Sequence, residues 1–330
     1  RELQRYFPLP LQKKYAAFME DHRLKREIIA TAVTNQMINR MGATFLMRMQ
    51  EDSGRTPGEV AKAFTITRET IEARTLWNRI DALDGTVPES VQVDALQVIW
   101  NLQRAFTRWL LARPGAIPDI TTAVERYHDG FHAIRNGRQI IADGQRAEHD
   151  ASLQAWIDKG VPADLAEQLA ALPYLEAACD IIEVASERRQ KPVDVARLHF
   201  RLGEALNLPW LTSQIDALEV DGRWHAVARG VLREELGEQH RALVSQVLAM
   251  PGATPEDKVA AWLARDDSAL RFTLAMLAAT GNEKYLAGFG PVVDGFDHVP
   301  FGNMNAVRAA ITERTGLVVV ETPANPTLEL

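Results

Sequence analysis

Apolar residues recur at intervals of three and four positions along most of this chain, and the pattern is strongest between residues 88 and 112. In that stretch one stripe is formed by Val91, Ala95, Ile99, Leu102, Phe106 and Trp109, and it is widened by Val93, Leu96 and Trp100. A helix that is apolar over so much of its surface must be covered by other elements. The segment therefore predicts a central helix of a multi-helix core, with Trp100 and Phe106 inside that core.

Two short motifs indicate where other helices begin. In "TPGE", Thr56 is placed as the cap, Pro57 in the first helical position and Glu59 as the acid that reaches back to the cap. "TPED" repeats this arrangement with Thr254 and Asp257. The periodicity predicts further helices at about residues 22–49, 57–64, 68–83, 117–141, 162–172, 174–189, 192–206, 223–248 and 268–279.

The pattern changes after Gly281. "GFGPVVDGFDHVPFGN" holds four glycines and two prolines in sixteen residues, which is typical of loops. "NAVRAAITER" then predicts a short helix, and "LVVVET" predicts a strand buried on both faces. The sequence thus predicts a mainly α fold, with a bundle-like helical body at residues 1–280 and a small α/β tail at residues 281–330.

Composition excludes some classes of partner. The chain has 330 residues, 46% of them apolar, and a formal net charge of −7. An acidic chain carries no overall positive field for nucleic acid, so we expect no nucleic-acid partner. No apolar run approaches the length of a membrane span, and the start "RELQRYFPLP" has no apolar core of a signal peptide. We therefore expect a cytoplasmic location and no membrane partner.

Two histidines four positions apart are the clearest candidate for a metal site. His128 and His132 would share one face of a helix and could hold a metal together with Glu125. A metalloprotease motif would need a glutamate directly after the first histidine, and Asp129 stands there instead. The alternative is a pair of histidines that are partly buried or lie at the helix surface.

No residue is assigned a catalytic, cofactor-binding or metal-binding role from these patterns. Cys179 lies on an apolar helix face in "LEAACDIIEV", which favours a small core residue over a nucleophile. "GFGPVVDG" resembles a dinucleotide loop only in its glycines, because it neither follows a strand nor opens a helix.

The stretch "HRLKREIIATAVTNQMINRMGATFLMRMQEDSG", residues 22–54, closely resembles the C-terminal region of large bacterial NAD-specific glutamate dehydrogenases. A weaker likeness continues through "ALQVIWNLQRAFTRWLLAR" and "LPYLEAACDIIEVA" to about Leu277. The resemblance implies a helical region that follows the catalytic domain. In that family the catalytic lysines and aspartate, and the glycines that hold NAD, lie upstream. It also implies NAD in the parent enzyme but none bound by this segment, and as partners an upstream catalytic domain and further copies in a homo-oligomer.

The tail resembles other families. Residues from about 271 to 316 look like an interior stretch of acetylornithine-type aminotransferases, and residues from about 317 to 330 are similar to cystathionine-synthase-like enzymes that use pyridoxal phosphate. In the second family the asparagine that matches Asn325 helps to hold cofactor or substrate. Such enzymes need a Schiff-base lysine, and Lys284 lies outside any such context. We interpret the tail as fragments joined to a helical body.

The leading hypothesis is a non-catalytic helical portion of an NAD-dependent glutamate dehydrogenase. The parent reaction would be oxidative deamination of L-glutamate to 2-oxoglutarate and ammonium, so the enzyme assignment belongs to the parent and stays open for this segment. One alternative is a stand-alone helical module for protein interaction. A less favoured alternative is a fragment of an aminotransferase that uses pyridoxal phosphate.

Overall fold

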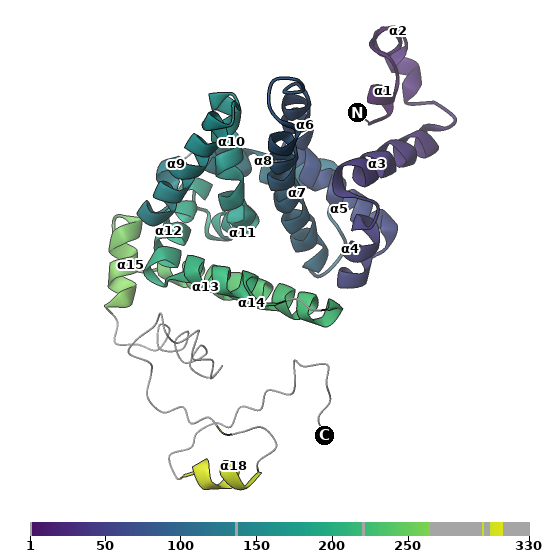
Figure 1. Cartoon of the computed structure of the whole chain (residues 1–330). Helices are drawn as coiled ribbons and strands as arrows, with labels where there is room; N and C mark the ends of the chain where they lie inside the picture. The colour runs from purple at the N-terminus through teal and green to yellow at the C-terminus, as the bar shows by residue number, and fades with distance from the viewer. Residues whose placement is uncertain (1, 136–137, 220–221, 265–298, 300–303, 313–330) are drawn as a thin grey trace. The chain divides into compact units, whose positions relative to one another are not determined.

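The computed structural model describes residues 2–135, 138–219, 222–264, 299 and 304–312. Every regular element in these ranges is a helix (Figure 1), which confirms the mainly α fold. The predicted helix at 268–279 and the predicted strand "LVVVET" lie outside the described residues. The short helix predicted in "NAVRAAITER" is confirmed as α18, Met304–Ala310.

The chain divides into two compact units, Arg1–Arg197 and Leu198–Leu330. The expected boundary between residues 280 and 281 lies outside the described residues and stays a prediction.

The first unit is built around α5, Pro57–Thr70. This helix packs against α3, α4, α6, α7 and α8. The elements of the unit are α1 Glu2–Tyr6, α2 Leu9–Met19, α3 Lys25–Met41, α4 Phe45–Ser53, α6 Ala73–Asp81, α7 Glu89–Ala112, α8 Ile120–Arg135, η1 Arg138–Ile140, α9 Asp143–Asp158, α10 Ala163–Ala171, η2 Leu172–Ala177 and α11 Ala178–Arg188. Helix α12, Pro192–Ala205, begins in this unit and continues in the second.

Helix α7 confirms the strongest sequence pattern on one side only. The stripe from Val91 to Phe106 is buried, but Val93 is 45% exposed. Trp100 is only partly buried, so its predicted place inside the core is wrong, whereas Phe106 is buried as predicted. Helix α7 packs against α4, α5, α6, α10 and η2, and these neighbours leave the widened edge, with Val93, Leu96 and Trp100, only partly covered.

Several helix boundaries differ from the predicted ones. The single helix predicted at 22–49 is split into α3 and α4 at Gly42, whose φ of 90° lies in the region that favours glycine. The break predicted between residues 64 and 68 falls instead after Thr70, where Glu72 takes a left-handed conformation. The periodicity predicts neither α1 and α2 nor α9 and α13, the last of which spans Leu208–Asp216. In α9 only His149 and Trp156 are buried, so its apolar stripe is weak.

The predicted helix starts are confirmed by their hydrogen bonds. At α5 the Thr56 hydroxyl accepts from the Glu59 amide, and the Glu59 carboxylate accepts from the Thr56 amide at 2.9 Å. The same reciprocal pair joins Thr254 and Asp257 at the start of α15. Each cap satisfies backbone donors that the first turn of a helix leaves without partners.

The second unit contains the remainder of α12 with α13 Leu208–Asp216, α14 Arg223–Leu248, α15 Pro255–Leu263 and α18. Helix α14 packs against α13 and α15. Leu211 and Ile215 of α13 are buried, and Trp210, Leu218 and Leu236 pack against them. Within the described residues of both units, no helix is long and apolar enough to cross a membrane.

Candidate functional site

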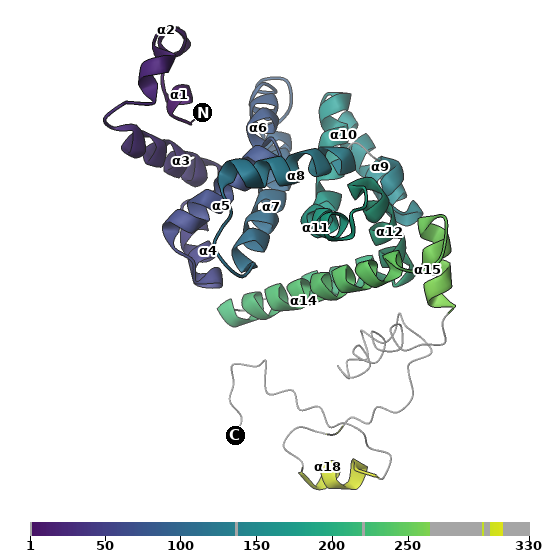
Figure 2. The same ribbon diagram turned by 180° about the vertical axis from the view of Figure 1, so that it is seen from behind.

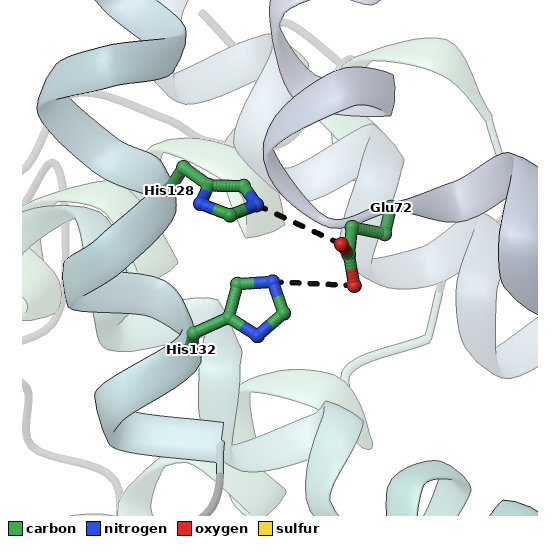
Figure 3. Close-up of side chains that lie close together, drawn as sticks. All are labelled: Glu72, His128 and His132. Atoms are coloured by element: carbon green, nitrogen blue, oxygen red, sulfur yellow. Dashed lines mark ion pairs between the residues drawn. The ribbon is translucent and has the colours of Figure 1, made fainter.

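Glu72, His128 and His132 converge from two parts of the first unit (Figure 3). Glu72 stands in the link between α5 and α6, and the histidines occupy successive turns of α8. The His132 Nε2 atom lies 3.2 Å from Oε2 of Glu72, and the His128 Nε2 atom lies 3.7 Å from Oε1. The two imidazole ring centres are 4.4 Å apart. One carboxylate therefore faces both rings.

The backbone at Glu72 explains how this carboxylate reaches α8. Glu72 has φ 53° and ψ 37°, a left-handed conformation that costs a non-glycine residue about 1–2 kcal/mol. The turn is held between buried neighbours, because Ile71 and Ala73 are both almost completely shielded from solvent. The core thus fixes the link between α5 and α6, and the Glu72 side chain points toward the two rings (Figure 3).

Charged side chains lie next to both rings. Arg135 donates from Nη2 to Nδ1 of His132 at 2.7 Å and also lies 3.4 Å from Oε2 of Glu72. Burial, and then the positive charge of Arg135, lower the pKa of His132. On the outer side, Oδ1 of Asp129 lies 3.1 Å from Nδ1 of His128. The His132 ring is therefore uncharged at neutral pH, which is the form that binds metals.

Glu72 replaces the acid that the sequence pattern suggested. The group of possible metal ligands holds Glu72 with His128 and His132, and Glu125 is not a member of it. Glu125 is exposed on α8, one turn before His128. The spacing along one helix correctly places the two histidines on one face. It contains no information about an acid on another element, and no signal in "RETIEAR" distinguishes Glu72 from a solvated surface charge.

The interpretation of Cys179 as a small core residue is confirmed. Its side chain is buried in α11, and burial raises the pKa of the thiol well above its usual range. A protonated, shielded thiol is a poor nucleophile. The other residues weighed from the sequence, Lys284, Asn325 and the "GFGPVVDG" stretch, lie outside the described residues.

A second charged cluster lies near the same end of α5 and is held by several ion pairs. The Arg68 side chain is 0% exposed. It donates to Gln36 at 2.6 Å, to Glu2 at 2.8 Å and to Glu69 at 3.0 Å. Arg74 donates to the same Glu2 carboxylate at 2.5 Å. Because both acids are shared with arginines from other elements, this cluster ties α1 to α3, α5 and α6, and its carboxylates are already engaged.

A polar cleft of about 490 Å³ opens beside this cluster. Its walls include Arg5, Arg40, Arg74 and Trp77. Arg40 pairs with Asp81 at 2.7 Å, and Arg74 pairs with Glu2. Arg5 lies 3.7 Å from both Glu2 and Glu69, so each arginine of the cleft already faces an acid of the protein. The Glu72, His128 and His132 group is therefore the stronger candidate for a binding site.

Comparison with known proteins identifies the region that this fold represents. The chain belongs to the family described as glutamate dehydrogenase, C-terminal, which it matches over residues 1–287. It is 33% identical over 267 residues to the NAD-specific glutamate dehydrogenase of Halomonas elongata, covering 80% of this chain and 16% of that protein. It is 33% identical over 266 residues to the Pseudomonas aeruginosa enzyme of the same name, with the same two coverages. The chain thus spans about one sixth of the length of these relatives.

A shorter similarity involves a different family. Over 49 residues, or 15% of the chain, it is 57% identical to the acetylornithine aminotransferase of Agrobacterium fabrum, of which 12% is covered. It is 59% identical over 49 residues to the enzyme of the same name from Brucella melitensis. These matches agree with the resemblance noted for part of the tail. The resemblance of the last residues to cystathionine-synthase-like enzymes stays a prediction.

Proposed function

We propose that this chain is a non-catalytic helical region of an NAD-dependent glutamate dehydrogenase and that it packs against the catalytic part of that enzyme. The observation that carries the proposal is the family match over residues 1–287. The parent reaction would be oxidative deamination of L-glutamate to 2-oxoglutarate and ammonium, with hydride passing to NAD. NAD would bind to the catalytic part, and the enzyme would act in the cytoplasm as a homo-oligomer.

An exposed apolar surface on the first unit supports packing against a partner. Between residues 6 and 24, six large apolar side chains are exposed, namely Tyr6, Leu9, Leu11, Tyr15, Phe18 and Leu24. We call this set the α2 surface. Helix α2 packs on α1, and it lies at the opposite end of α3 from α4 in both views (Figures 1 and 2). Concentrated exposed apolar side chains are typical of protein interfaces.

The comparison with the relatives indicates which protein part could bind the α2 surface. The matched part of each relative is about one sixth of a protein named as an NAD-specific glutamate dehydrogenase, so most of each relative's chain lies outside the match. A catalytic domain in the same chain would stay at a high effective concentration beside this surface. We therefore assign the α2 surface to the catalytic part, in preference to an unrelated partner.

Association in trans tests this proposal. The chain would be mixed with a glutamate dehydrogenase of this family that lacks the matched C-terminal region, and the affinity would be measured by calorimetry. Phe18, which is 73% exposed, is the first target, and Phe18→Ser should weaken association by about tenfold or more. Val231→Ser is the matched control, because Val231 is 58% exposed but belongs to α14.

Two results would contradict the proposal. One is equal weakening by Phe18→Ser and Val231→Ser, or no association at all. The other is glutamate-dependent NAD reduction by the isolated chain that a point mutation within the chain abolishes. Binding of an unrelated protein at the α2 surface, without binding of the catalytic part, would favour the alternative of a stand-alone interaction module.

A further inference from the structure

We propose that Glu72, His128 and His132 form a binding site for a divalent transition-metal ion, and that zinc fits the ligand set best. The site lies in the first unit and is made by residues of α8 and of the link between α5 and α6. The inference goes beyond the proposed function, because neither packing against a catalytic part nor the parent reaction requires a metal here.

The spacing of the candidate ligand atoms fits zinc. Nitrogen and oxygen ligands lie about 2.0–2.2 Å from zinc in a tetrahedral site, which separates neighbouring ligand atoms by about 3.4 Å. The two separations between the Glu72 carboxylate and the histidine Nε2 atoms are 3.2 and 3.7 Å. All three ligand atoms lie within 4.8 Å of one another. Small side-chain rotations would therefore bring the three ligand atoms around one ion.

An unpartnered ring nitrogen gives independent support. The Nε2 atom of His132 is shielded from solvent and makes no hydrogen bond, although the Glu72 carboxylate is only 3.2 Å away. Shielded polar atoms are nearly always satisfied in proteins, so an exception needs a physical reason. A metal ion between His132 and Glu72 would satisfy this nitrogen.

Two charged neighbours, Asp129 and Arg135, affect the metal affinity of the site in opposite directions. Asp129 faces Nδ1 of His128 at 3.1 Å, which is the carboxylate–histidine arrangement that orients many metal ligands. Arg135 opposes binding, because it donates to Nδ1 of His132. When Nε2 of His132 binds metal, its proton must move to Nδ1, and Arg135 must then release that atom. Arg135 therefore lowers the affinity of the site without removing a ligand.

Three protein ligands leave one tetrahedral position for water or another small ligand. The ligand side chains are 24–39% exposed, so an ion can reach them. A bound ion would join the strained link at Glu72 to α8 and stabilise the contact between them.

Zinc titration of the untagged full chain tests the site, with zinc chloride alone as the probe and a chromophoric chelator as competitor. We expect one equivalent to bind. Removing a residue that only orients a metal ligand typically costs 10–100-fold in affinity. Removing a ligand itself should cost at least as much, so we expect Glu72→Gln, His128→Gln and His132→Gln each to weaken zinc binding by about 100-fold or more. Glu125→Gln is the matched control, because it removes the acid next to the histidines in sequence, and it should leave affinity within about twofold.

Arg135→Met supplies a test that keeps all three ligands. Loss of the nearby positive charge should tighten zinc binding by about tenfold. The helical circular dichroism of each variant is measured without metal, so that unfolding is separated from ligand loss. Phe18→Ser should bind zinc like the wild type, which makes failure of this site distinguishable from failure of the proposed function. The inference is overturned if the wild type binds no zinc at millimolar concentration, or if Glu72→Gln and Glu125→Gln behave alike.

Discussion

Two histidine pairs in this chain differ in what surrounds them. His128 and His132 lie in the first unit, with ring centres 4.4 Å apart and the Glu72 carboxylate opposite both. His199 of α12 and His240 of α14 lie in the second unit, with ring centres 3.9 Å apart. His240 is buried, and its Nε2 atom lies 3.1 Å from the His199 carbonyl oxygen.

The difference shows that proximity of two histidines does not define their role. Among the described residues, the group of possible metal ligands includes the first pair and not the second. Burial lowers the pKa of His199, and it lowers that of His240 to about 4. The second pair is therefore neutral and stabilising near pH 7, whereas the first pair faces an acid and remains within reach of ions.

The largest effect is expected at the structural cluster beside the first pair. Arg68→Met should lower the free energy of unfolding by about 3 kcal/mol, because it removes a buried charge that holds Glu2 and Glu69. Arg79→Met is the control; it breaks the pair with Asp164, whose side chain is 74% exposed, and should cost at most about 1 kcal/mol. Urea unfolding measures both. Equal losses would show that the buried cluster is not what holds α1 to α5.

The second pair should make the protein sensitive to acid. A buried histidine has a pKa of about 6.5 in the unfolded chain and a lower pKa in the folded protein. Above pH 6.5 it is neutral in both states and does not oppose folding. As the pH falls below 6.5 the unfolded chain binds the proton more readily, so the folded protein loses stability. For His240 the loss should reach about 2 kcal/mol at pH 5. His240→Gln keeps a donor for the His199 carbonyl but cannot titrate in this range, so it should reduce the slope of the pH profile of urea unfolding between pH 7 and 5, to which His199 also contributes. An unchanged slope would contradict the role given to this residue.

Each pair has a glycine nearby, and the two glycines should respond differently to alanine. A Cβ at Gly130 would lie 2.8 Å from Cγ1 of Ile182, whereas a Cβ at Gly203 would lie 3.2 Å from Cε1 of His240. At Gly130 alanine also brings a helix preference of about 0.5–1 kcal/mol, but the Ile182 side chain must shift to admit the Cβ, so we expect a net loss of about 1–2 kcal/mol. At Gly203 a smaller clash is offset by the helix preference of alanine, about 0.5–1 kcal/mol, so the net change should be near zero. Thermal unfolding of both variants measures the two losses of stability. A larger loss for Gly203→Ala than for Gly130→Ala would contradict this prediction.

The sequence predicts the helical body well where the apolar stripe is regular or a cap is explicit. Helix α7 and the caps at Thr56 and Thr254 follow from local rules that act within a few residues. The apolar pattern does not predict helix α9, because few of its residues are buried. It wrongly predicts that Trp100 lies inside the core, because periodicity does not show how much of a helix its neighbours cover.

In the candidate metal site, local sequence spacing predicts the two histidines but not the acid that faces them. His128 and His132 share a face because they are four residues apart on one helix. Glu72 reaches them through a left-handed turn that tertiary packing enforces on a non-glycine residue, and single-residue preferences argue against such a turn. The similarity to glutamate dehydrogenases is spread over residues 1–287 and does not depend on a catalytic motif.

The contrast between the two pairs rests on Glu72, and anomalous diffraction at the zinc edge tests it most directly. Crystals of the full chain would be soaked in zinc chloride. We expect a peak about 2.0–2.2 Å from a Glu72 carboxylate oxygen and from Nε2 of both His128 and His132. We expect no peak beside His199 and His240. A peak at the second pair, or none at Glu72, would show that Glu72 does not distinguish the two pairs.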